Sequence, residues 1–192
     1  MPILGVIASS TRQGLVTDTG SMFALSSIIV PSAGTSTITF SNIPSTYTHL
    51  QIRGIGRNSA SGTGALETYM RFNSDTGANY VAYHQIAGDG TNASAAASTG
   101  QTSIAPFYFV RDGNTANVFG SVIIDILDYT NTNKNKVIRT INGWNTNGSG
   151  LIYLKSGMWL NTTAINTITF TVEGGHNFVA NSQFSLYGIK GA

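Results

Sequence analysis

The chain has 192 residues, a length that fits one domain with a single core. Charged residues make up only 9% of it, against roughly 25% in ordinary soluble domains, and the net charge of +2 is too thinly spread for a nucleic-acid-binding surface. The chain contains no cysteine, which excludes disulfides, thiolate metal sites and a cysteine nucleophile.

The first 20 residues form a segment of their own. They begin with a short apolar stretch and then show neither helical nor strand periodicity. The apolar stretch is too short to span a bilayer and no basic residues precede it, so we expect a soluble, mature protein with no membrane partner. We interpret residues 1–20 as an extended arm that anchors to a neighbouring subunit, through Pro2, Ile3, Leu4, Val6 and Ile7.

Residues 21–192 are predicted to form one all-β domain. Short runs rich in β-branched and aromatic residues alternate with turns containing Gly, Asn, Asp or Pro, and no long helix is indicated. The predicted strands are 22–30, 36–41, 47–55, 67–73, 79–86, 103–110, 117–128, 135–144, 150–159, 165–174 and 183–189. Such spacing is typical of an antiparallel sandwich or barrel.

The predicted strands differ in how many faces they bury. Residues 35–40, 46–53 and 165–172 alternate apolar with polar side chains, which indicates one buried face each. The run 118–129 is more continuously apolar, as expected of a central strand that is covered on both sides or lies at a subunit contact. Residues 58–64 and 91–100, with their small uncharged side chains, are predicted to be loops.

No catalytic constellation emerges from the acidic residues. Asp75, Asp89 and Asp112 lie near glycine in predicted turns, where the carboxylate is expected to serve the local backbone. Asp125 and Asp128 are three residues apart on a predicted strand and so point to opposite faces. A carboxylate pair for cleaving polysaccharide is the weakest hypothesis, and we predict that the chain is not an enzyme.

Metal and nucleophile motifs are also missing from the sequence. His49, His84 and His176 are far apart in the chain, and no Asp-rich loop indicates calcium. No Gly-x-Ser-x-Gly elbow occurs, and Gly54-Ile-Gly56 does not precede a helix. We therefore predict no metal and no cofactor.

Four aromatic residues are candidates for either packing or ligand contact: Trp144, Trp159, Tyr80 and Tyr83. Core or interface packing is the favoured interpretation, and stacking against a host-surface glycan is the alternative. The charge-poor composition likewise has two interpretations, an assembly subunit or an extracellular β-protein with a Thr-rich surface. We favour the assembly subunit because a nearly uncharged surface lacks the repulsion that keeps monomers apart.

Four segments resemble virion structural proteins of tailed bacteriophages. They are residues 36–53 (STITFSNIPSTYTHLQIR), 70–80 (MRFNSDTGANY), 124–136 (IDILDYTNTNKNK) and 184–190 (FSLYGIK). The arm and the two small-residue segments fall outside this resemblance. It implies a β-sandwich, expected to be a jelly roll, that forms a homotrimer on the outer surface of the phage particle. No functional residue carries over from it.

The resemblance and the composition together predict a structural role. The first hypothesis is a capsid decoration, cement or head-fibre protein whose arm attaches it to the major capsid protein or to other virion proteins. The alternative is a tail-fibre or tail-appendage adhesin that binds host-surface glycans through its loops and aromatic residues.

Overall fold

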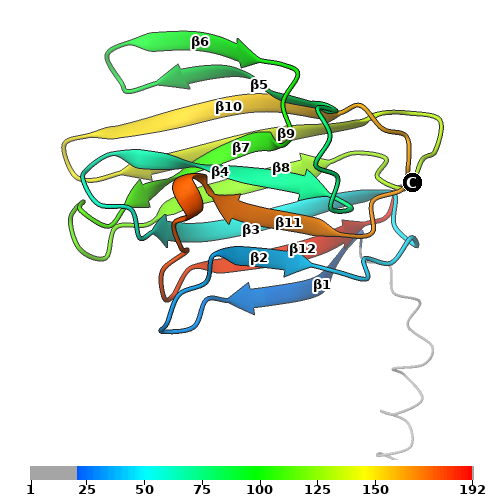
Figure 1. The fold of residues 1–192 in the computed structure, drawn as a ribbon, viewed down its shortest axis with the longest axis horizontal. Helices are drawn as coiled ribbons and strands as arrows, with labels where there is room; N and C mark the ends of the chain where they lie inside the picture. The colour runs from blue at the N-terminus through cyan, green and yellow to red at the C-terminus, as the bar shows by residue number, and fades with distance from the viewer. Residues whose placement is uncertain (1–20, 192) are drawn as a thin grey trace, which may run out of the picture.

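The computed structural model describes residues 21–191 as an all-β protein (Figure 1). A single turn of 3₁₀ helix at Glu173–Gly175 is the helical element in this part of the chain. The strands are β1 (Met22–Ile29), β2 (Thr37–Phe40), β3 (His49–Asn58), β4 (Ala65–Phe72), β5 (Tyr80–Gly88), β6 (Ala93–Ser98), β7 (Ile104–Arg111), β8 (Gly120–Ile126), β9 (Lys136–Asn145), β10 (Gly150–Trp159), β11 (Ile168–Val172) and β12 (Gln183–Ile189).

Hydrogen bonds join all twelve strands into one mixed, mostly antiparallel sheet. A longer group has the order β1-β12-β3-β8-β9-β10-β5-β6, and a shorter group has the order β2-β11-β4-β7. The two groups meet where β3 and β7 pair in parallel, through Arg57 with Val110 and Asn58 with Arg111. The ladders within both groups are antiparallel.

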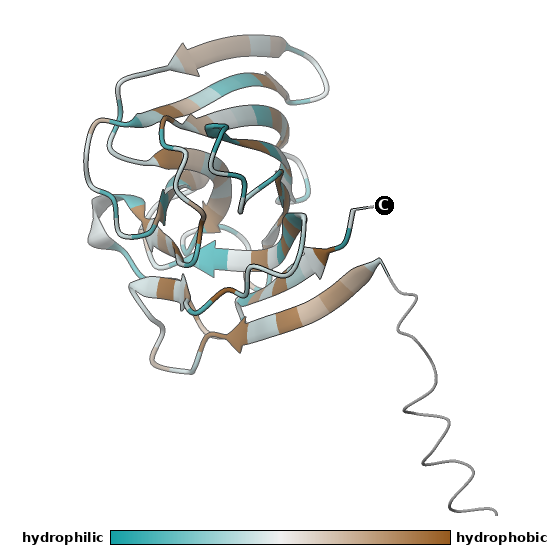
Figure 2. Cartoon of the chain, turned by 90° about the vertical axis from the view of Figure 1, so that its right-hand side faces the viewer, coloured by the Kyte–Doolittle hydropathy of each residue, from teal (hydrophilic) through white to brown (hydrophobic). Residues whose placement is uncertain are grey.

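Aromatic side chains from both groups fill the space between them. The Phe184 ring of β12 lies 5.6 Å from that of Phe170 on β11 and 5.7 Å from that of Phe109 on β7. Gly56 on β3 is needed for this packing, because a Cβ there would lie 2.2 Å from the Phe109 ring. Alternation along the strands places one set of side chains in this core and leaves the other set outside. Figure 2 shows hydrophobic and hydrophilic residues following one another along the strands.

Two buried cations fix loops at the ends of the strands. Arg57 is 5% exposed and donates five hydrogen bonds, to the Asp112 carboxylate and to backbone carbonyls between residues 112 and 118. The Lys136 ammonium donates to the carbonyls of Asn131, Lys134 and Thr162, so its charge is solvated by the backbone.

The sequence located the strands well. Each predicted strand has a counterpart whose ends differ by at most three residues, and the prediction of an all-β fold is confirmed. The run 118–129 contains β8, which lies between β3 and β9 as a central strand should. Of the two alternatives for this run, cover on both sides by the chain itself is wrong because Ile123 on the outer face is 41% exposed, and a subunit contact stays a prediction.

The prediction of a loop at 91–100 is also wrong, because residues 93–98 form β6, which pairs with β5. Both faces of β6 are exposed apart from partial cover at Ser98. A strand without a buried face has no reason to alternate polar and apolar residues, so its composition resembles that of a loop. In Figure 1 the β5–β6 hairpin lies at the end of the sheet farthest from β1.

Candidate functional site

The outer face of the longer strand group carries a line of exposed aliphatic side chains. Antiparallel register places each of them directly opposite the next across β8, β9, β10, β5 and β6. We call this line the aliphatic row: Ile123, Ile141, Leu154, Ile86 and Ala95. The four larger side chains are 41–60% exposed, which is unusual for neighbouring aliphatic residues on a protein surface.

A second line of residues runs beside the aliphatic row, two positions away along each strand, and its members are small except for Ile152, which is 61% exposed. We call it the small row: Ser121, Gly143, Ile152, Gly88 and Ala93. Neither row contains a charged side chain. On β8, β9 and β5 the register therefore sets an isoleucine of one row beside a serine or glycine of the other.

A polar row borders the aliphatic row on its other side and consists of Gln51, Asp125, Arg139, Ser156 and His84. The Arg139 guanidinium lies 3.6 Å from the Asp125 carboxylate, which also accepts a 2.9 Å hydrogen bond from Gln51. Because the acid and the base pair with each other, this border carries little net charge.

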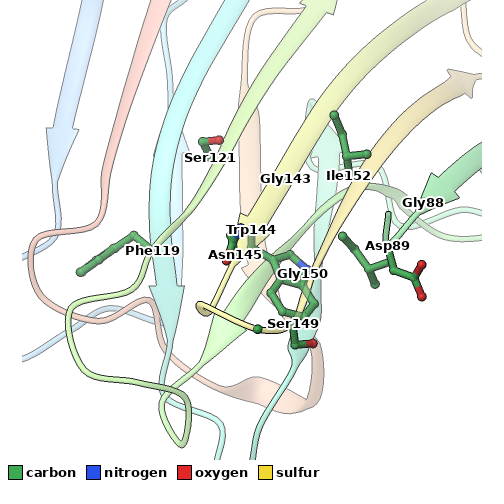
Figure 3. A pocket seen from close by; sticks show the side chains of 12 residues that line it. Gly88, Asp89, Phe119, Ser121, Gly143, Trp144, Asn145, Ser149, Gly150 and Ile152 are labelled. Atoms are coloured by element: carbon green, nitrogen blue, oxygen red, sulfur yellow. The ribbon is translucent and has the colours of Figure 1, made fainter. Parts of the chain in front are cut away.

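An open hollow of about 660 Å³ lies over the small row at the β9–β10 hairpin (Figure 3). Ser121, Gly143, Gly88 and Ile152 contribute to its lining, together with residues from the adjoining turns such as Phe119. Two further hollows, of about 640 and 340 Å³, flank Ile86 and Leu154 nearer β6. The outer face is thus a ridge of aliphatic side chains with hollows beside it.

The four aromatic candidates lie apart from this ridge. Tyr80 and Trp159 are completely or almost completely buried, with their rings 6.3 Å apart, so they pack in the core and offer no platform to a glycan. Trp144 is 9% exposed and lines the hollow, and its indole Nε1 has no hydrogen-bond partner among the described residues. Tyr83 is half-buried on the inner side of β5, beside Lys155.

Lys155 is the most unusual titratable group in the described chain. It is 2% exposed, and its ammonium donates to the Ala105 carbonyl and lies 4.1, 4.9 and 5.2 Å from the ring centres of Tyr108, Tyr83 and Tyr153. Burial lowers the pKa of Lys155 to about 7, and the charge of Glu67 opposes this shift. The Tyr108 hydroxyl donates to Glu67, and burial raises the pKa of Tyr108.

The carboxylates of Asp75 and Asp89 accept hydrogen bonds from amides of their own turns, as the sequence indicated, whereas the prediction for Asp112 is wrong because its carboxylate accepts from the distant Arg57 side chain. Asp75 accepts hydrogen bonds from the Gly77 amide and the Trp159 indole, and Asp89 accepts them from two amides of its own turn. A hydrogen bond from Lys134 holds the pKa of Asp128 below its usual value. Within residues 21–191, no three His, Asp or Glu side chains are grouped closely enough to hold a metal ion.

The predicted arm residues Pro2, Ile3, Leu4, Val6 and Ile7 lie outside the described residues. In the described part, no helix has the length and apolar character needed to cross a membrane. Searches with family models and against curated proteins found no match to this chain.

Proposed function

We propose that this chain is a structural component on the exterior of a bacteriophage particle, a capsid decoration, cement or head-fibre protein. One observation carries the proposal: an uncharged aliphatic row is exposed on a sheet in a chain with only 9% charged residues. Such a face is costly to leave in water and is suited to permanent contact with other subunits. The resemblance of four segments to phage virion proteins is the reason for proposing that the larger assembly is a phage particle.

The proposal includes a finer description of the fold, a β-sandwich of the jelly-roll type with an N-terminal arm. Its support is the face-to-face packing of the two strand groups around Phe184 and its aromatic neighbours. In this proposal the arm, residues 1–20, attaches the domain to the major capsid protein or another virion protein. Copies assemble further through the sheet, as the homotrimer implied by the resemblance would require.

The physical basis is burial of apolar surface without chemistry. Burying a full Ile or Leu side chain contributes about 1.5–3 kcal/mol, so the half-exposed aliphatic row offers on the order of 5 kcal/mol per copy. Association entropy offsets part of this contribution. Multiplied over many copies in a shell, the remainder strengthens the particle, and no enzymatic activity is part of the proposal.

The test of the anchor is a deletion of residues 2–20. We expect the shortened protein to fold but to be missing from purified particles when it replaces the full chain in an infected host. A matched control is the full chain with Leu160→Lys, a change at an exposed residue outside the row, which should still join particles. Antibody labelling in electron micrographs then gives the position on the head, neck or tail. Incorporation of the deletion variant at full occupancy would show that the arm is not the anchor.

A second candidate function is a tail-fibre or tail-appendage adhesin that binds host-surface glycans. The observation in its favour is the open hollow, whose lining combines the rings of Phe119 and Trp144 with polar groups such as Asp89. Glycans are bound by this mixture of aromatic faces and hydrogen-bonding groups. Saturable binding on a glycan array that is lost in Phe119→Ala would favour the adhesin over the decoration protein.

A further inference from the structure

The glycines of the small row are not explained by the fold of the chain itself. Gly143 and Gly88 have no positive φ angle, and a Cβ built on either would meet its nearest atom at 3.6 or 3.7 Å, an ordinary contact. By contrast, a Cβ at Gly54 or Gly157 of the same strand group would lie within 3 Å of a core side chain. Glycine weakens a strand, and within one it is found at bulges, at tight bends and where another surface approaches closely. The ladders have no bulge at Gly88 or Gly143, which favours close approach.

The shape of the outer face indicates which surface approaches. A two-fold contact joins the same patch on both subunits, so the patch must complement itself. A ridge that runs parallel to a line whose residues are small on β8, β9 and β5 meets this requirement on those three strands. A two-fold axis lying between the two rows, perpendicular to the strands, brings the aliphatic row of each copy over the small row of the other.

We propose that a second copy of this chain packs face to face on β8, β9, β10 and β5 in this way. Ile141 of one copy then lies over Gly143 of the second copy. The same rotation places Ile123 over Ser121, and Ile86 over Gly88. On these three strands each large side chain fills the space left by a small residue on the same strand of the other copy, whereas on β10 Leu154 meets the large side chain of Ile152.

Charge and area are compatible with this partner. The two rows contain no charged group from β8 to β6, and the nearest charge in line with them is Arg53 on β3, opposite Ile123 at the edge of the patch. The polar row contains an acid and a base, Asp125 and Arg139, that pair with each other. The polar rows of two copies therefore do not repel each other. From strand and row spacings, the two rows cover roughly 330 Å² per copy, or about 650 Å² in total, which is the size of a weak, reversible contact. The inference rests on the self-assembly part of the proposed function, and it gives the contact through this sheet two-fold symmetry in place of the three-fold symmetry that the resemblance implies.

The first experiment measures the mass of the purified full chain by sedimentation equilibrium, up to several hundred micromolar. We expect a reversible dimer. Leu154→Lys should weaken it at least about tenfold, whereas Leu160→Lys, the same change at a residue of similar exposure outside the row, should leave it unchanged. Gly143→Leu should weaken the dimer more than Gly143→Ala because it fills more of the hollow, and thermal unfolding should confirm that each variant is folded.

The second experiment tests the register and uses the fact that the chain has no cysteine. A mixture of Ile141→Cys and Gly143→Cys proteins should form more disulfide-linked dimer on oxidation than either protein alone. Equal cross-linking in the separate proteins, a wild-type monomer at all concentrations, or a trimer unaffected by Leu154→Lys would each overturn the pairing. None of these readouts uses particles, so absence of the protein from particles would refute the proposed function and leave the pairing standing.

Discussion

Lys155 shows how a single residue can couple the fold to pH. Its ammonium is removed from water and receives one carbonyl and three aromatic rings in exchange. These contacts do not replace hydration fully, so burial favours the neutral amine. The sequence contains no signal for this environment, because Lys155 alternates with Leu154 and Ser156 as any strand residue would.

The first prediction concerns stability against pH. An unfolded lysine has a pKa near 10.4, whereas the pKa of Lys155 in the folded protein is about 7. Between these values the unfolded chain binds more protons, so the free energy of unfolding should rise as the pH increases. We expect a gain of up to about 3 kcal/mol from pH 7 to 9.5.

Urea denaturation of wild type and Lys155→Met across this range provides the measurement. The variant lacks the titrating amine and should give a nearly flat profile. The range stops at pH 9.5 because burial raises the pKa of Tyr108 and Tyr153, and this introduces an opposite dependence at higher pH. Parallel profiles for the two proteins would show that Lys155 is not the group responsible.

The second prediction concerns Arg57, whose guanidinium holds the loop between β7 and β8. Arg57→Ala removes five hydrogen bonds from a buried position and should lower the free energy of unfolding by about 3 kcal/mol. The control is Arg139→Ala, where the lost ion pair involves a side chain that is 62% exposed, with an expected cost below about 1 kcal/mol. Chemical denaturation of both variants checks the difference, and similar losses would mean that the Arg57 contacts add little.

At the scale of elements, β6 differs from the rest of the sheet. It is an edge strand whose six residues are all alanine or serine, and it has no proline, bulge or charge of the kind that protects natural edges. Its side chains add almost nothing to the core, so backbone hydrogen bonds to β5 are what hold it in place. This is also why sequence periodicity missed it.

The third prediction follows from the position of β6 at the edge of the sheet. Amides of β6 should exchange with deuterium much faster than those of β8, which is paired on both sides and buries Ile124. Hydrogen exchange measured by mass spectrometry on peptides covering 89–100 and 118–128 provides the comparison. At low protein concentration, where no dimer forms, equally slow exchange in both peptides would show that β6 is stabilised by contacts beyond β5.

At the scale of the whole molecule, the low charge of the chain determines how its surfaces associate. Ten basic and eight acidic residues are spread over 192 positions, and none lies in the aliphatic or small row. Association through this face therefore depends on apolar burial and not on attraction between charges.

The fourth prediction is that self-association responds weakly to salt. Raising sodium chloride from about 0.05 to 0.5 M screens ionic contacts strongly, yet the dimer dissociation constant should change by less than about threefold. Cooling should weaken the dimer, because apolar association is driven by entropy near room temperature. Sedimentation at several salt concentrations and temperatures tests both effects, and a steep loss of affinity with salt would indicate an ionic interface elsewhere.

The sequence by itself determined the fold class and every described strand except β6, because alternation and turn residues are local properties of neighbouring positions. It also indicated that the turn carboxylates at Asp75 and Asp89 serve their own backbone. The sequence did not decide which aromatic residues pack in the core and which are exposed. Nothing local distinguishes Tyr80 and Trp159, which are buried, from exposed strand aromatics.

Only the tertiary structure decided where the candidate interface lies. Ile123, Ile141, Leu154 and Ile86 come from four strands, and they form one row because the register of three ladders aligns them. Gly143 lies within the predicted strand 135–144, and Gly88 lies two residues beyond the predicted strand 79–86. Whether each glycine serves the core or a partner could be decided only from the space around its Cα atom. A glycine needed for core packing and a glycine needed for contact with a partner look the same in a sequence.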